Sequence, residues 1–329
     1  MSRPVLEVIR HHLGDHPAVK AWSKLEPAWA GPASIHVLRE RRSSGIYRLT
    51  DAGPGGSGVM AKRCRPVGAS VERAVYAEVL PRLPVSAPRY YGYVEDDGGS
   101  CWLFLEDVGG ERYASSDEEQ CALAGRWLGL MHTSATIITD AAAAAARLPD
   151  GGPGRYLRHL RLAREDILRN ISNPVLTAED VALLTAMVSQ HDLLEGRWER
   201  LEEACERAPS TLVHGDFRPK NAYIRTDHAG PRLFPIDWET AGWGPPAADL
   251  ARVDITAYWS VVREGWSLDL QDIRRLATVG RVFGFLAAIG WKSPSLAYDS
   301  PRLLSEPLAS MRVLQGSLSN AIRAAEEAA

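Results

Sequence analysis

Apolar and polar residues follow two different patterns along this chain, and the change falls near residue 107. From Ser34 to about Leu105, short apolar segments such as IHVLRE, IYRLT and VMAKR are separated by turn-forming sequences such as DAGPGGSG. Segments of this kind are typical of β-strands. One helical segment, SVERAVYAEVL, comes before two further strand-like segments that flank a DDGG turn. We therefore predict the order strand, strand, strand, helix, strand, strand in a small β-rich lobe over residues 33–107.

After residue 107, apolar residues recur at the three- and four-residue spacing of amphipathic helices. Three segments show it: EEQCALAGRWLGLMHT, RYLRHLRLAREDILRNI and TAEDVALLTAMVSQHDLLEGRWERLEEACERA. Ser116 and Glu119 form a capping-box sequence at the start of the first segment. Between these helices and the C-terminal ones lies TLVHGDFRPKNAYIRTDHAGPRLFPIDW, which we interpret as loops and short strands. The pattern predicts a larger, mainly helical lobe over residues 108–329.

The first residues of the chain also show helical spacing. Apolar side chains at this spacing are Val5, Leu6, Ile9 and Leu13. Pro17 lies beyond them, and a segment containing Pro and Trp continues to Pro32. We predict a short N-terminal helix followed by a linker over residues 1–32.

Composition and charge narrow the classes of partner. The chain has 329 residues and a net charge of −3, so it lacks the basic character typical of proteins that bind nucleic acid or anionic membranes. No apolar segment reaches the roughly 18 residues of a membrane span. The four cysteines contain no C-x-x-C pair, which argues against a zinc site or a disulfide framework. We expect a cytoplasmic protein that binds neither nucleic acid nor membrane.

The segment HGDFRPKN, residues 214–221, is the first candidate for chemistry. Asp216 and Asn221 are five residues apart. Protein kinases use an Asp and an Asn at this separation, the Asp accepting the proton of the substrate hydroxyl and the Asn binding Mg²⁺. The alternative is that both are ordinary turn residues.

A carboxylate downstream strengthens the first interpretation. Asp237 follows a short apolar segment and lies sixteen residues after Asn221. A Mg²⁺ ion bound to nucleotide phosphates needs about one or two protein carboxylates together with other oxygen ligands. Asp237 supplies a carboxylate and Asn221 an amide oxygen. The alternative role for Asp237 is a salt bridge or a turn cap.

Together these motifs resemble the aminoglycoside phosphotransferase and choline kinase superfamily, in its broad bacterial branch. The matching sequences are HGD-x-x-x-x-N and then IDWE-x-x-x-x-G-x-P-x-x-D-L. The resemblance implies an α+β, protein-kinase-like fold with a small β-rich lobe and a larger helical lobe. It also implies a helical insert at about residues 155–208. The activity implied is transfer of the γ-phosphate of ATP, with Mg²⁺, to a hydroxyl group of a small molecule.

The resemblance assigns roles to the residues that match these motifs. Asp216 resembles the catalytic base, and His214 the residue that orients its loop. Asn221 and Asp237 resemble the metal ligands. Asp249 resembles a structural carboxylate that hydrogen-bonds the catalytic loop, and a helix N-cap is its competing role. Two further residues have open roles: Glu239 faces the acceptor or solvent, and Arg218 stands where many relatives have His.

Lys62 is the candidate for the nucleotide phosphates in the small lobe. It alternates with apolar residues in VMAKRCR and resembles the strand lysine that contacts the α- and β-phosphates. Glu72, ten residues later, resembles its ion-pair partner on a helix. Glu78 is the competing partner. The alternative for Lys62 itself is a solvated lysine on a strand edge.

Two further nucleotide contacts are implied by position. Ser43, Ser44 and Gly45 lie between the first two predicted strands, where the family has its phosphate loop, although a G-x-G-x-x-G sequence is absent. A plain hairpin turn is the alternative. Glu106 and Val108 resemble the hinge that pairs with adenine through a backbone C=O and N–H.

The acceptor is less specified than the nucleotide. Five of the ten tryptophans lie within residues 238–291, and their faces suit sugar rings or ammonium groups as well as core packing. Ten acidic and nine basic residues lie from Trp238 to Ala329, so no acidic surplus points to a polycationic aminoglycoside. A sugar, amino alcohol or other natural product fits equally. The alternatives are a silent nucleotide-binding pseudokinase, a protein kinase and, more remotely, a metal-dependent hydrolase.

Overall fold

The structure is a computed structural model that describes residues 5–25, 31–42, 44–96, 99–137 and 147–328. Contacts divide the chain into two compact units. The first unit comprises Met1–Pro149 and Phe217–Ala241, and the second comprises Asp150–Asp216 and Gly242–Ala329.

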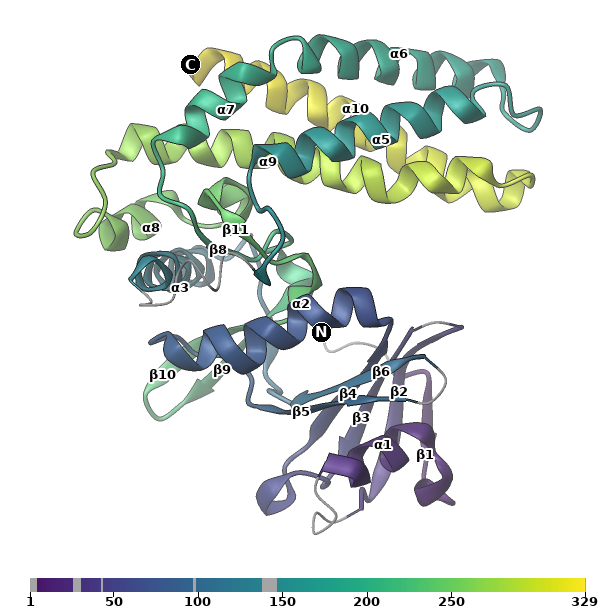
Figure 1. The fold of residues 1–329 in the computed structure, drawn as a ribbon, viewed down its shortest axis with the longest axis vertical. Coiled ribbons are helices and arrows are strands. Elements are labelled where there is room, and N and C mark those ends of the chain that lie inside the picture. The colour runs from purple at the N-terminus through teal and green to yellow at the C-terminus, as the bar shows by residue number, and fades with distance from the viewer. Residues whose placement is uncertain (1–4, 26–30, 43, 97–98, 138–146, 329) are drawn as a thin grey trace. The chain divides into compact units, whose positions relative to one another are not determined.

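The first unit contains a six-stranded antiparallel sheet (Figure 1). The strands occur in the spatial order β1-β2-β3-β4-β6-β5. Their bounds are β1 Glu7–Ile9, β2 Ser34–Arg41, β3 Ser44–Thr50, β4 Val59–Cys64, β5 Tyr90–Glu95 and β6 Cys101–Glu106. Helix α2 (Pro66–Ala74) follows β4 and continues as a π-turn over Val75–Val79 and a 3-10 turn over Leu80–Arg82. The predicted order of strands and helix is confirmed.

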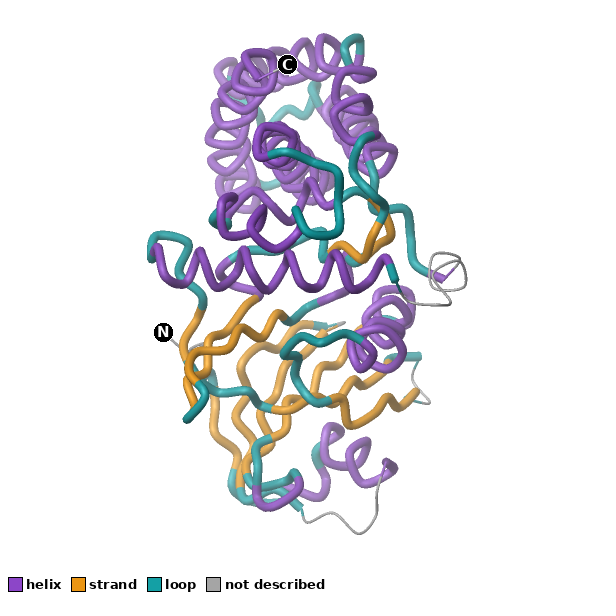
Figure 2. The backbone as a smooth tube through the Cα atoms, turned by 90° about the vertical axis from the view of Figure 1, so that its left-hand side faces the viewer, coloured by secondary structure: helices purple, strands orange, loops and turns teal. Residues whose placement is uncertain are grey.

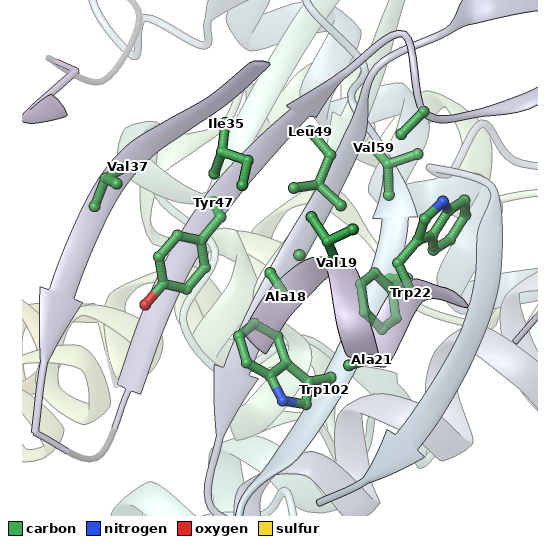
Figure 3. Packing of buried hydrophobic residues seen from close by; sticks show 13 residues of the cluster. Ala18, Val19, Ala21, Trp22, Ile35, Val37, Tyr47, Leu49, Val59 and Trp102 are labelled. Atoms are coloured by element: carbon green, nitrogen blue, oxygen red, sulfur yellow. The ribbon is translucent and has the colours of Figure 1, made fainter. Parts of the chain in front are cut away.

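Helix α1 (Pro17–Leu25) covers one face of this sheet. Figure 3 shows its Ala18, Val19 and Trp22 pointing toward strand side chains. Those strand residues are Ile35, Val37, Tyr47, Leu49, Val59, Ala61, Trp102 and Phe104. They alternate along their strands because successive side chains point to opposite faces. The other face of the same strands is therefore left for a different set of side chains.

The helix predicted near the N-terminus is wrong in its position. Residues Glu7–Ile9 form β1, which pairs antiparallel with β2, and a short 3-10 turn covers Leu13–Asp15. The helix begins instead at Pro17, in the segment predicted as a linker. A proline suits the first helical position because its missing N–H has no intrahelical partner there. Burial of Trp22, 1% exposed, anchors the helix to the sheet.

A second, three-stranded sheet of the first unit has the order β10-β9-β7. Its strands are β7 Glu111–Arg112, β9 Ala222–Asp227 and β10 Gly230–Pro235. Helix α3 (Glu118–Thr136) follows β7. Its N-cap is Asp117, which accepts a hydrogen bond from the backbone N–H of Gln120 at 3.0 Å, so the capping box predicted from Ser116 is wrong by one residue.

The second unit is mainly helical, and its long helices lie alongside one another (Figure 2). They are α5 Pro153–Asn170, α6 Ala178–Glu195, α7 Trp198–Glu206, α8 Ile255–Val262, α9 Leu270–Lys292 and α10 Pro301–Ala328. Short 3-10 segments cover Pro246–Arg252 and Ser293–Ala297. The long helix predicted from Thr177 is two helices, because the chain breaks at Gly196 and Arg197. The predicted α+β class, with a β-rich part and a helical part, is confirmed.

A two-stranded ribbon in the second unit carries the HGD motif. Strand β8 (Thr211–Val213) pairs antiparallel with β11 (Gly242–Gly244). Across the described helices, none combines the length and apolar character needed to cross a bilayer.

Candidate active site

A pocket in the first unit lies on the face of the six-stranded sheet opposite α1. Its walls are mostly apolar side chains, and a few charged groups converge on it. The lining residues are Leu38, Ile46, Arg48, Met60, Lys62, Glu72, Leu105, Glu106, Asp107, Val108, Gly109, Gly110, Tyr223, Ile236 and Asp237. An apolar pocket with a small number of placed charges is typical of sites for small ligands and cofactors.

Lys62 and Glu72 form the ion pair predicted from the sequence. Lys62 lies on β4 and its Nζ is 2.7 Å from Glu72 Oε2 on α2. Burial by itself would lower the pKa of Lys62, but the carboxylates of Glu72 and Asp237 outweigh it and raise that pKa well above its ordinary value. The lysine is therefore charged and held in place. Glu78, the competing partner, pairs with Arg147 instead.

Asp237 also contacts Lys62 Nζ, and it does so from the end of β10. Its backbone is in the left-handed region, with φ of 71°. A residue other than glycine adopts that region at a cost and usually where the surrounding structure requires it. The conformation begins the 3-10 turn Trp238–Thr240 and places the carboxylate in the pocket.

Asn221 lies beside this position at the same end of the β9–β10 hairpin. Ala222 is opposite Pro235 in the register, so the residues just outside them, Asn221 and Ile236, are neighbours. The backbone N–H of Ile236 donates to the Asn221 carbonyl at 2.8 Å. The hairpin thereby brings the backbones of the two proposed metal ligands, Asn221 and Asp237, to the same end of the sheet.

This donor set fits Mg²⁺ shared with a nucleotide. Mg²⁺ is usually held by one or two carboxylates plus substrate phosphates, and the rest of its octahedral shell is water. Within the described parts of the chain, no group of three His, Cys, Asp or Glu residues could hold a metal ion alone. One carboxylate and one amide oxygen, beside a charged lysine, agree with an ion that needs phosphate oxygens to complete its shell.

The HGD segment in the second unit is held by Asp249. Its carboxylate accepts hydrogen bonds from the backbone N–H groups of His214, at 2.7 Å, and Gly215, at 2.9 Å. Asp249 is fully buried and lies inside the 3-10 segment Pro246–Arg252, whose N-cap is Pro245. The predicted structural role of Asp249 is thus confirmed, and the competing N-cap role is wrong.

His214 and Asp216 are linked within the same segment. The backbone N–H of Asp216 donates to His214 Nδ1 at 3.3 Å. His214 is buried, whereas Asp216 is partly exposed. Gly215 between them has a φ of +75°, which favours glycine. The segment therefore holds the Asp216 backbone by local contacts and leaves part of the residue accessible.

The predicted hinge residues line the pocket, but two neighbours there were missed. Glu106 and Val108 are both among the lining residues. The Glu106 carboxylate pairs with Arg225 at 2.6 Å. Its side chain is therefore engaged, and the predicted contact with a ligand is left to its backbone. Arg48 and Asp107, which the sequence did not indicate, form an ion pair at 2.6 Å in the same wall. The alternation of Ile46 and Arg48 along β3 is the sequence signal that could have placed Arg48 on the pocket face.

The predicted phosphate loop is only partly supported. Ser43 lies outside the described residues. Ser44 and Gly45 begin β3 but are not among the residues that line the pocket. A Cβ on Gly45 would lie 2.6 Å from ring atoms of Tyr47 on the opposite face, so this glycine has a packing role.

The structure gives positions to Glu239 and to the tryptophans, whose roles the sequence left open. Glu239, left between the acceptor and solvent, has Oε2 3.6 Å from Lys62 Nζ and a side chain that is half exposed. Among the five tryptophans, Trp238 and Trp266 are buried and pack in cores, whereas Trp291 is 43% exposed.

Comparison with known proteins identifies the family and the fold of the chain. The sequence matches the phosphotransferase enzyme family (APH) over residues 35–282. A solved GDP complex of wild-type aminoglycoside 2′-phosphotransferase-IIIa is similar with a TM-score of 0.62 and 16% identity, covering 90% of this chain and 97% of that one. Choline kinase from Cryptosporidium parvum Iowa II is similar with a TM-score of 0.58 and 13% identity, covering 87% of this chain and 90% of that one. A microcompartment-associated aminopropanol kinase is similar with a TM-score of 0.57 and 14% identity, covering 94% of this chain and 98% of that one.

At these identities the structural likeness shows a shared fold. The predicted protein-kinase-like fold of the aminoglycoside phosphotransferase and choline kinase group is confirmed. A search of curated protein sequences found no match to the chain.

Proposed function

Because the chain belongs to the phosphotransferase enzyme family, we propose that it transfers the γ-phosphate of ATP to a hydroxyl group of a small molecule. The observation that carries the proposal is the arrangement of Lys62, Glu72 and Asp237 around one apolar pocket. A charged lysine fixed by a helix glutamate meets phosphates without a large ordering cost. The nucleotide class is supported by the GDP complex of a protein that shares the fold.

Each residue has a part in this proposal. Lys62 contacts the nucleotide phosphates, and Glu72 holds it extended. Asn221 and Asp237 hold Mg²⁺, which when bound neutralises charge on the phosphate oxygens. The backbone groups of Glu106 and Val108 pair with the base.

Asp216 is proposed as the group that receives the proton of the acceptor hydroxyl. Transfer of a phosphoryl group requires the acceptor oxygen to be positioned and its proton removed as the new bond forms. A carboxylate does both by accepting a hydrogen bond from the hydroxyl. His214 and Asp249 act as positioning residues, since they bind the backbone of the same segment.

The acceptor class stays broad in this proposal. A sugar, an amino alcohol, an aminoglycoside or another hydroxylated natural product is compatible with the nearly balanced charge of the C-terminal helices. Proteins of the same fold include a choline kinase and an aminopropanol kinase. The intact set of Lys62, Asp216, Asn221 and Asp237 favours an active enzyme over a silent pseudokinase.

The proposal is tested by an ADP-release screen with Mg·ATP, Mg·GTP and a panel of sugars, amino alcohols and aminoglycosides. Release that depends on one acceptor, together with a phosphorylated product in the mass spectrum, is the expected result. Absence of nucleotide binding in calorimetry, with no release for any acceptor, contradicts it. Nucleotide binding without transfer to any hydroxyl would favour the pseudokinase instead.

Lys62→Met is expected to raise the KM for ATP and to lower kcat, each by about tenfold or more, because charge-assisted bonds to phosphate are lost. Acceptor affinity should stay close to wild type. Steady-state kinetics with each substrate varied in turn provide the measurement. Lys24→Met, at an exposed lysine of α1 on the other face of the sheet, is the control. Unchanged kinetics for Lys62→Met would exclude it from the phosphate site.

A further inference from the structure

Strand β2 carries an arginine on the pocket face of the sheet, close to the turn that lacks the family's glycines. In the strand register Arg39 is directly opposite Ile46, and Ile46 is directly opposite Lys62. Directly opposite residues in an antiparallel sheet have their side chains on the same face. Ile46 and Lys62 both line the pocket, so Arg39 shares their face.

An irregularity in β2 explains this orientation. The register between β2 and β3 shifts between Val37 and Arg39. Val37 packs in the core against α1, whereas Leu38 lines the pocket on the other face. In regular alternation Arg39 would return to the core face. A bulge places two consecutive side chains, Leu38 and Arg39, on the pocket side.

The contacts of Arg39 leave its charge uncompensated. One guanidinium nitrogen, Nη2, donates to Ser44 Oγ at 3.2 Å, so the side chain lies along this face toward the turn. Its Nε is buried without a hydrogen-bond partner among the described residues. No carboxylate in the described ranges pairs with Arg39, in contrast to Arg48, which pairs with Asp107. A half-buried guanidinium without an acidic partner is costly unless a ligand supplies the negative charge.

We propose that Arg39 binds a phosphate group of the nucleotide, replacing with a side chain the backbone contacts that a glycine-rich loop would make. The inference rests on the proposed nucleotide site. Arg39 and Lys62 are separated by one strand, or about 10 Å between backbones, so their side chains approach a polyphosphate from two sides. Arginine presents a planar set of donors that suits phosphate oxygens. The absence of the family's glycine pattern and the presence of this arginine then have one explanation.

Arg63 provides a matched control. It follows Lys62 directly on β4, so its side chain points to the opposite face of the same sheet. There its Nη2 donates to the Arg41 carbonyl at 3.1 Å. Arg39→Ala and Arg63→Ala therefore remove the same charge from strands β2 and β4 of one sheet, but only Arg39 lies on the pocket face of that sheet.

The experiment measures binding of ATP, ADP and adenosine to the full chain by calorimetry. Arg39→Ala is expected to weaken ATP and ADP binding by about 10- to 100-fold and to leave adenosine binding unchanged. Arg63→Ala should bind all three as the wild type does. Arg39→Gln, which retains most of the side chain, gives the same comparison if thermal melting shows that the alanine variant is unfolded.

Three results overturn the inference, and they are distinguishable. Wild-type ATP affinity in the folded Arg39 variants shows that Arg39 does not contact phosphate. An equal loss of adenosine and ATP binding shows that Arg39 shapes the pocket and does not bind the phosphates. If the wild-type chain binds no nucleotide at all, the proposed function fails together with this inference.

Discussion

Asp216→Asn is expected to lower kcat by roughly 10²- to 10⁴-fold, the contribution of a positioned general base. The amide keeps the shape of the side chain but cannot accept the proton of the acceptor hydroxyl. Binding of Mg·ATP should stay close to wild type, because Asp237 and Asn221 are the proposed metal ligands. The loss should therefore appear in kcat and not in the dissociation constant for the nucleotide.

Steady-state kinetics with a verified acceptor and calorimetry with Mg·ATP separate these two effects. Asp299→Asn, at an exposed aspartate of the same unit, is the control and should be neutral. A near-normal kcat in Asp216→Asn would mean that another group takes the proton. Loss of nucleotide binding would mean instead that Asp216 acts in the metal site or in folding, and the roles of Asp216 and Asp237 would need to be reassigned.

Asp237→Ala is expected to reduce Mg²⁺-dependent turnover by more than about 100-fold and to weaken Mg·ATP binding. The ion loses its carboxylate ligand. The transition state then loses several kcal/mol of stabilisation of the charge on the transferring phosphoryl group. The alanine variant also carries a backbone cost, because Asp237 is in the left-handed conformation. Asp237→Asn is the cleaner variant, since asparagine tolerates that conformation and still removes the charge.

Calorimetry with ATP in the presence and absence of Mg²⁺ is the measurement. For both variants, the affinity for metal-free ATP should lie closer to the wild-type value than the affinity for Mg·ATP does. Asp227→Ala is the matched control, since Asp227 lies at the opposite end of the same hairpin, where it pairs with Arg232. Wild-type Mg·ATP affinity with intact turnover in Asp237→Asn would remove Asp237 from the metal site.

The sequence alone was sufficient for features that depend on residues close together in the chain. Alternation of apolar residues predicted the strands from β2 to β6. The pairing of Lys62 with Glu72 was implied by the resemblance to the family, and the structure contains that ion pair. The spacing of Asp216, Asn221 and Asp237 in the sequence led to the roles proposed for them, and these roles stay predictions. Local periodicity encodes the strands and helices directly.

Local pattern failed where two structures fit the same residues. Apolar residues from Val5 to Leu13 suit one helical turn or two, but pairing with β2 makes Glu7–Ile9 a strand. Helical spacing continued through Gly196 without showing that the helix breaks there. Short segments have small intrinsic preferences, and pairing or burial against the rest of the chain outweighs them.

Only the tertiary structure decided contacts between residues far apart in the chain. Lys62 and Asp237 are 175 positions apart, and Asp249 reaches the backbone of His214 across 35 positions. The ion pair of Arg48 with Asp107 and the orientation of Arg39 depend likewise on strand order and on one register shift. The sequence shows which residues are apolar or charged and how they recur along the chain. The register between strands determines which of these residues meet on one face of a sheet.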